Sequence, residues 1–350
     1  MVKLPGTVDD LFSHMELLGL ARILEQSDTV KGPVLLGWES PETMTIDTAD
    51  GNLDSTLLAV SVRQFIELTA SQREILGQEI QISGKLHSPL SPRVAHAFTP
   101  EEWTEYFRCR QHIVDRIEPE NPLMASLVGC LGSPSYWTRL TGTKEEQKVD
   151  QGASRWEMAP RNSGSEFFKS KYEKLLGYIG SLEVQEIIDR ILRKYLKNNG
   201  ENENACGFRP TAPADSLLSW ICYQGISCFP TRPIASGRSG RDSASTGVLE
   251  PAKGQHERVA FVLPIFSRPI TIDRYLCVCR YAGLYEITGA MRHGENHISP
   301  DLVLKKRWLT DHQVEGIAWF ARNVGGTKNC PKYWALPGNI IELESTAEMP

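Results

Sequence analysis

Apolar residues recur at helical spacing in several parts of the chain. Leu11, Met15 and Leu18 follow one another at intervals of three or four residues, and Thr7 precedes them where a helix cap belongs. Comparable patterns predict helices over residues 55–74, 123–131, 163–178, 182–198, 214–223, 272–281 and 310–320. The spacing therefore predicts a chain rich in amphipathic helices.

The strongest local signal for a helix start is the sequence Thr99-Pro100-Glu101-Glu102. It supplies a capping hydroxyl, a proline suited to the first turn, and two acids that favour the positive end of the helix dipole. We expect this helix to continue to about Arg116.

Shorter apolar runs predict strands between the helices. They cover residues 34–38, 44–46, 155–158, 226–229, 259–266 and 333–343. Residues 235–256 are rich in Ser, Gly and charge, which predicts a mobile loop. The mixture predicts an α+β fold in which a sheet-containing domain carries a helix-rich middle segment.

The elements group into three expected regions. Residues 1–154 form an N-terminal α+β region, and residues 155–230 form a helix-rich segment with a basic loop. Residues 231–350 form a C-terminal α+β region that contains the loop at 235–256.

Composition narrows the class of protein. The 350 residues are 41% hydrophobic and 23% charged, which is enough apolar material for a core and excludes a disordered chain. No apolar run reaches the roughly 18 residues needed to span a membrane, and the N-terminus does not look like a secretory signal. The eight cysteines lack the spacing of a zinc site, so we expect reduced, buried thiols. We therefore expect a cytoplasmic protein without a membrane partner.

Charge is spread unevenly along the chain. The net charge is −5, yet residues 1–60 hold 3 basic and 10 acidic side chains, whereas residues 231–280 hold 8 basic and 4 acidic ones. A protein that binds DNA alone and nonspecifically usually carries a strong basic surplus. The distribution allows a subunit that meets nucleic acid on one face and protein on the others.

Signatures of catalysis are scarce. The chain has no nucleophile elbow, no phosphate-binding loop and no HExxH zinc motif, so we expect neither an enzyme nor a bound cofactor or metal. His293 and His297, with Asp301 nearby, leave a metal-dependent nuclease or hydrolase as the alternative. Glycine and proline around these histidines indicate a loop, which is a poor scaffold for metal ligands.

Two loops carry the residues that we expect to contact nucleic acid. Arg161 and Asn162 follow Pro160 and precede a predicted helix start, where a phosphate or a base edge can bind. Lys169 and Lys171 extend this basic surface. A second loop places three arginines among small residues, a combination that suits contact with a phosphate backbone: Arg232, Arg238 and Arg241.

Two other basic motifs carry weaker signals. In Ser88-Pro89-Leu90-Ser91-Pro92-Arg93, one arginine after two prolines favours a structural turn. In Lys305-Lys306-Arg307-Trp308, an aromatic ring beside three cations allows stacking on a base, but a half-buried tryptophan with a charged rim is the simpler interpretation.

Four stretches follow one another in a distinctive order. The first is an apolar helix at residues 17–21 that leads to a strand with Trp38, and the second is the Arg-Asn-Ser-Gly loop at 161–164. The third, at 217–230, is a helix that ends in glycine before a Phe-Pro pair, and the fourth is the apolar run at 262–270. In this order the chain resembles the large subunits of type I CRISPR effector complexes (Cascade), particularly their shorter and divergent members.

The resemblance implies a subunit without chemistry of its own. Such subunits help to recognise the protospacer-adjacent motif, help to open duplex DNA, and provide a docking surface for a helicase-nuclease. The implied partners are guide RNA, the other Cascade subunits, target double-stranded DNA and the helicase-nuclease. The Arg161/Asn162 loop and the arginines at 232, 238 and 241 are the positions at which contact with the motif or strand is reasonable. An assembly protein that does not touch nucleic acid is a third possibility.

Overall fold

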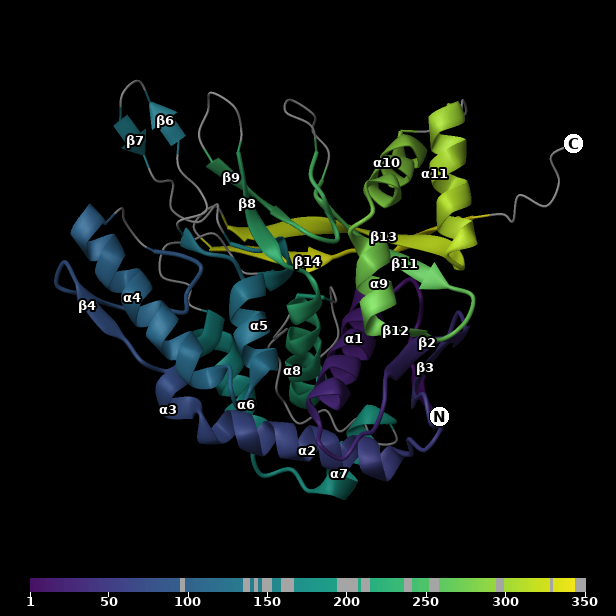
Figure 1. The fold of residues 1–350 in the computed structure, drawn as a ribbon, viewed down its shortest axis with the longest axis horizontal. Coiled ribbons are helices and arrows are strands. Elements are labelled where there is room, and N and C mark those ends of the chain that lie inside the picture. Colours follow the sequence, from purple (N-terminus) through teal and green to yellow (C-terminus); the bar gives the residue numbers. More distant parts are fainter. Residues whose placement is uncertain are drawn as a thin grey trace, which may run out of the picture.

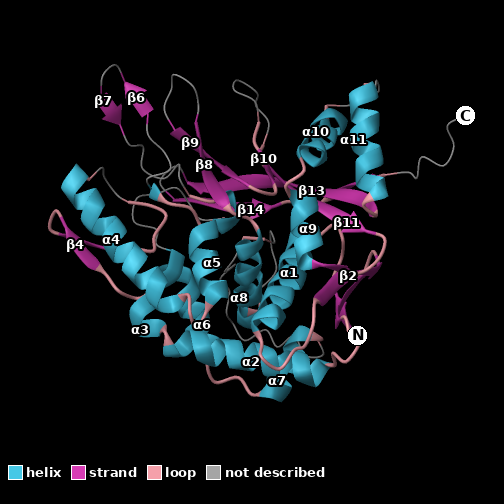
Figure 2. Ribbon diagram, in the orientation of Figure 1, coloured by secondary structure: helices cyan, strands magenta, loops and turns pink. Residues whose placement is uncertain are grey.

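The computed structural model describes residues 1–94, 98–134, 139–141, 144–146, 153–158, 167–193, 207–208, 215–235, 241–251, 258–293, 299–327 and 330–343. It has the mixed α+β fold that the sequence predicts. Figures 1 and 2 show most of the helices packed below a large antiparallel sheet, with two helices above it.

Three N-terminal strands and one short strand from the C-terminal region form a small antiparallel sheet against a buried helix. The strand order is β1-β3-β2-β12. Its elements are β1 (Val2–Pro5), β2 (Val34–Ser40), β3 (Thr43–Thr48) and β12 (Ile270–Thr271), and the helix is α1 (Leu11–Gln26). Asp10 caps α1 by accepting from the Phe12 N–H, so the helix begins three residues later than a Thr7 cap would place it.

Ten further α-helices follow α1 in the described part of the chain. They are α2 (Ser55–Ser71), α3 (Arg73–Leu76), α4 (Pro100–Ile117), α5 (Pro122–Cys130), α6 (Glu173–Ile179), α7 (Val184–Ile191), α8 (Ser216–Gly225), α9 (Ile272–Cys279), α10 (Ala282–Arg292) and α11 (Pro300–Asp311). The start of α4 is the one predicted, because Thr99 and Glu102 form a reciprocal capping box.

The large sheet comes from the C-terminal region. Its strands are β10 (Val248–Leu249), β11 (Ala260–Phe266), β13 (Val314–Thr327), β14 (Cys330–Ala335) and β15 (Asn339–Glu342). β13 pairs with β11 along one edge and with β15 and then β14 along the other. Every residue of β11 is buried, because helices cover both of its faces.

Three short hairpins project from this framework. They join β4 (Ile80–Ile82) to β5 (Lys85–His87), β6 (Arg139–Thr141) to β7 (Lys144–Glu146), and β8 (Thr231–Ala235) to β9 (Arg241–Ser245). The hairpins β6–β7 and β8–β9 rise on the same side of the large sheet in Figure 1.

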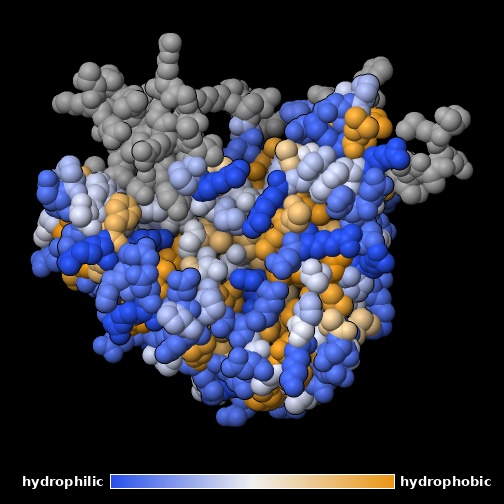
Figure 3. Space-filling model, in the orientation of Figure 1, coloured by the Kyte–Doolittle hydropathy of each residue, from blue (hydrophilic) through white to orange (hydrophobic). Residues whose placement is uncertain are grey.

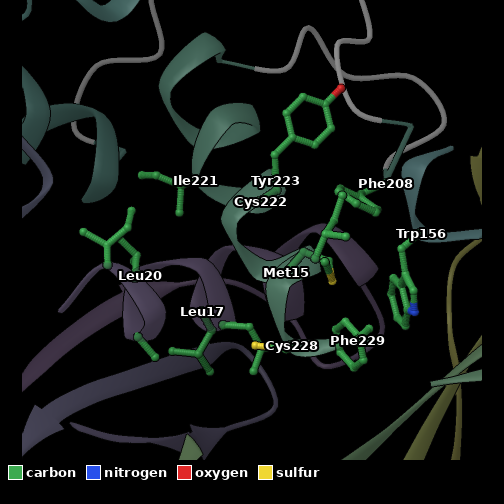
Figure 4. Close-up of a cluster of buried hydrophobic side chains, with 14 of the residues drawn as sticks. Met15, Leu17, Leu20, Trp156, Phe208, Ile221, Cys222, Tyr223, Cys228 and Phe229 are labelled. Carbon is green, nitrogen blue, oxygen red and sulfur yellow. The ribbon is translucent and has the colours of Figure 1, made fainter. Parts of the chain in front are cut away.

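Helices α1 and α8 cross at the centre of the core. A Cβ atom at Gly19 would lie 1.9 Å from the Ile221 carbonyl oxygen, so only glycine permits this backbone approach. Figure 4 shows side chains from distant parts of the chain packed around the crossing, among them Met15, Leu17, Leu20, Trp156, Phe208, Ile221 and Phe229. One buried cluster thus contains residues from all three regions expected from the sequence.

Several local predictions were wrong. Residues 310–320 are not a helix, because α11 ends at Asp311 and β13 begins at Val314. The strands predicted at 155–158 and 226–229 are 3-10 turns, at Arg155–Glu157 and Ile226–Cys228. The stretch expected to be a loop, 235–256, contains β9 and β10 in its described part.

Candidate nucleic-acid interface

Lys169 and Lys171 lie on a π-helical turn, Phe168–Tyr172, that leads into α6. Lys169 is exposed, and its Nζ lies 2.8 Å from Glu79 Oε1. Arg73 and Glu173, which line a shallow pocket beside it, form a second ion pair at 2.9 Å. Carboxylates therefore offset much of the positive charge that the sequence predicted at this surface.

The β8–β9 hairpin carries the second predicted group. Arg232 is exposed and pairs in register with Ala244, whereas position 241 pairs with Ala235. Position 241 shares a face with its ladder partner, position 235. Positions 232 and 235 are three residues apart on β8 and therefore belong to opposite faces, so the register assigns 232 and 241 to opposite faces of the ribbon. A two-stranded ribbon of this kind has the width of the DNA major groove.

The base of this hairpin is held firmly. Thr231 and Ser245 are joined across the ladder by a 2.8 Å hydrogen bond between their hydroxyls. The buried Trp156 stacks on Phe229 at 4.1 Å and donates its indole N–H to the Thr246 carbonyl at 2.7 Å. These contacts anchor both ends of the ribbon to the core.

Tyr285 ties the same region to α10. Its hydroxyl accepts from the Gly247 N–H at 2.8 Å and donates to the Cys279 carbonyl. Burial raises the pKa of Tyr285, so the phenol remains a neutral donor. The ribbon therefore rests on a fixed base.

The predicted residues do not form a single surface in the described structure. The turn that carries Lys169 and Lys171 leads into α6 in the lower half of the molecule, whereas β8 and β9 lie in the upper half (Figure 1). Arg161, Asn162 and Arg238 lie outside the described residues.

The sequence did not identify an aromatic and basic face on the large sheet. Trp319 of β13 and Trp334 of β14 are both half-buried. The Arg292 guanidinium lies 4.9 Å from the centre of the Trp319 ring, a cation–π contact. Residues 316–341 hold no Asp or Glu, although the whole chain is acidic. The signal that could have revealed this face is the β-branched and aromatic content of the stretch.

Side-chain chemistry elsewhere is largely structural. Arg93 forms a buried ion pair with Glu157 at 2.6 Å, as expected of a structural turn. Trp308 stacks on Tyr281 at 4.0 Å and on His312 at 3.7 Å, so protein rings occupy its surface. On the face seen in Figure 3, hydrophilic residues alternate with small hydrophobic patches.

The structure describes only some of the residues behind the alternative nuclease hypothesis. His293 follows the last turn of α10 and is exposed, whereas His297 lies outside the described residues. Asp301 forms an ion pair with Lys305. Within the described ranges no group of three or more His, Cys, Asp or Glu side chains could hold a metal ion.

Four of the described cysteines are buried as expected, whereas Cys277 is exposed and Cys109 is half-buried, contrary to the prediction. Cys277 is exposed on α9, whereas Cys279 is buried, so the two do not face a common ligand. Burial raises the pKa of Cys130 and of Cys228 to about 12, which keeps both as thiols.

Comparisons with known proteins give no relative for this chain. No protein-family model matches it, and neither a curated protein nor a solved structure is significantly similar to it. Of the helices in the described residues, none combines the length and the apolar content that crossing a bilayer requires.

Proposed function

We propose that this protein is a non-catalytic subunit of an RNA-guided type I CRISPR effector complex and contacts target DNA through the β8–β9 hairpin. The observation that carries the DNA contact is the exposed Arg232 on a ribbon whose base is anchored to the core. The resemblance of the sequence to Cascade large subunits supports the assignment to such a complex.

A fixed base matters for this function because recognition depends on where the arginines are held. A ribbon that enters the major groove can direct an arginine toward a guanine edge or toward a flanking phosphate. The exposed Arg232 is the side chain that this proposal directs toward the DNA. Reading of a protospacer-adjacent motif and opening of the duplex belong to the same proposal.

The direct test compares two arginines. We expect Arg232→Ala to weaken binding of short duplex DNA about tenfold and to reduce the slope of log affinity against log salt by about 0.9 for a lost phosphate contact. Arg108→Ala is the matched control, because Arg108 is equally cationic, 76% exposed and located on α4. Fluorescence anisotropy at several salt concentrations measures both variants. Equal affinities of wild type and Arg232→Ala for duplex DNA would refute the hairpin assignment.

The complex itself needs a second measurement. We expect the protein, purified from its native host, to carry a guide RNA and several protein partners. Mass spectrometry and RNA extraction identify them, and a protein that purifies alone without any transcript contradicts the assignment to a CRISPR complex.

A further inference from the structure

Trp334 reaches across the large sheet to Gly325, which has no side chain. A Cβ atom at Gly325 would be 2.5 Å from Trp334 Cη2 and 2.9 Å from Cζ3, so the outer end of the indole ring lies where a side chain at position 325 would stand. The indole therefore packs against the bare backbone of β13. Since Trp334 is only half-buried, its exposed part is directed outward.

Polar and cationic residues share this face of the sheet. Asn323 is opposite Trp334 in the ladder, and the exposed Lys332 is opposite Gly325. Side chains two residues apart on a strand point to the same face, which groups these four positions.

Trp319 continues the same face toward α10. It lies four residues before Asn323, or about 13 Å along the strand. Arg292 lies over the Trp319 ring and donates to the Arg258 carbonyl at 3.1 Å. Figure 1 shows α10 and α11 above one end of the sheet, with the paired ends of β13 and β14 extending beyond them.

We infer that this face is a stacking platform for unpaired bases of a single-stranded polynucleotide. The inference rests on the proposed function and deepens it, because it assigns duplex contact to the hairpin and single-strand contact to the sheet. Flat aromatic rings bind bases of any sequence by stacking, and nearby cations attract the phosphates. Lys332 and Arg292 supply positive charge here, and residues 316–341 hold no Asp or Glu, which favours a polyanionic ligand. A duplex fits it poorly, because paired bases hide the faces that would stack.

The test measures binding of labelled oligothymidylate and oligouridylate of about 12 nucleotides, with a blunt DNA duplex in parallel. We expect Trp334→Ala to weaken single-strand binding about fivefold to a hundredfold with little change in its salt slope. Lys332→Ala should reduce that slope by about 0.7, because it removes a phosphate contact. The two oligonucleotides distinguish a DNA ligand from an RNA ligand.

Two further variants protect the test from a folding artefact. Gly325→Ala keeps the tryptophan but displaces its ring, so it should also weaken single-strand binding. Trp103→Ala removes a half-buried tryptophan from a separate aromatic cluster on α4, and it should leave the affinity unchanged. Thermal unfolding of each variant identifies those that remain folded.

The outcomes separate the two proposals. If folded Trp334→Ala and Gly325→Ala bind single strands as tightly as wild type, the platform is refuted, and an Arg232-dependent duplex affinity would still support the hairpin. If Trp334→Ala lowers the affinity for single strands but Arg232→Ala leaves the affinity for duplex DNA unchanged, the platform is supported and the hairpin assignment is refuted. A wild-type protein that binds neither form overturns both.

Discussion

His14 makes the stability of this protein sensitive to acid. It lies on α1 at 2% exposure, with its ring 4.9 Å from that of Trp38 and 5.5 Å from that of Phe320. Its Nε2 is 2.9 Å from the Val8 carbonyl oxygen, which fits a neutral ring that donates there. Burial lowers the pKa of His14 from 6.5 to about 4, although the Val8 carbonyl and the nearby Asp10 and Asp9 act in the opposite direction.

The size of the effect follows from the two pKa values. Above pH 6.5 the ring is neutral in the folded and unfolded chains, so His14 costs no stability. Between pH 6.5 and about 4 only the unfolded chain binds the proton, and each pH unit lowers the free energy of unfolding by about 1.4 kcal/mol. The loss through this window therefore amounts to about 3 kcal/mol.

The assay is urea unfolding at a series of pH values between 7 and 4 for wild type and His14→Gln. Glutamine can donate to the Val8 carbonyl but does not titrate, so the wild-type stability should fall more steeply as the pH decreases. Carboxylates contribute equally to both proteins and cancel in the difference. The exposed His112→Gln is the control and should keep the wild-type profile. Parallel profiles for wild type and His14→Gln would refute the reasoning.

Two packing and capping predictions complete the set. Gly19→Ala should lower the free energy of unfolding by about 3 kcal/mol or more, because the added methyl group meets the Ile221 backbone, whereas Gly129→Ala has open space and should be neutral or slightly stabilising in chemical denaturation. Thr99→Ala should cost about 1 kcal/mol by removing the capping box of α4, and an unchanged unfolding midpoint would contradict this.

Elements with strong local signals were predictable from the sequence. The capping residue Thr99 directly precedes α4 and Glu102 lies in its first turn, so the start of the helix follows from four consecutive residues. The apolar run of β11 was equally clear, because burial on both faces removes any need for polar positions. The mixed α+β class followed from the presence of both patterns.

The error at residues 310–320 has a physical cause. Apolar residues there match helical spacing, but the same residues also suit a strand that is covered on both faces. Ser299 caps α11 and Pro300 occupies its first turn, so the helix starts and ends earlier than predicted. Pairing of β13 with β11 decides the outcome, and a contact with a strand some 50 residues away leaves no local trace.

The candidate site was only partly predictable. Clustered arginines pointed to the β8–β9 segment, but the sequence could not show that positions 232 and 241 belong to different faces. Trp334 became a candidate only through its ladder position and the bare backbone of Gly325. Register is a long-range property, so sites built on it appear only in the folded chain.

The crossing of α1 and α8 has a consequence for synthesis on the ribosome. Helix α1, with 13 of its residues destined for burial, is synthesised about 190 residues before α8. Until then the apolar surface of α1 lacks the helix against which it packs, so we expect the nascent chain to depend on chaperones. A truncated chain that ends before residue 216 lacks α8, so its core stays incomplete and we expect it to aggregate.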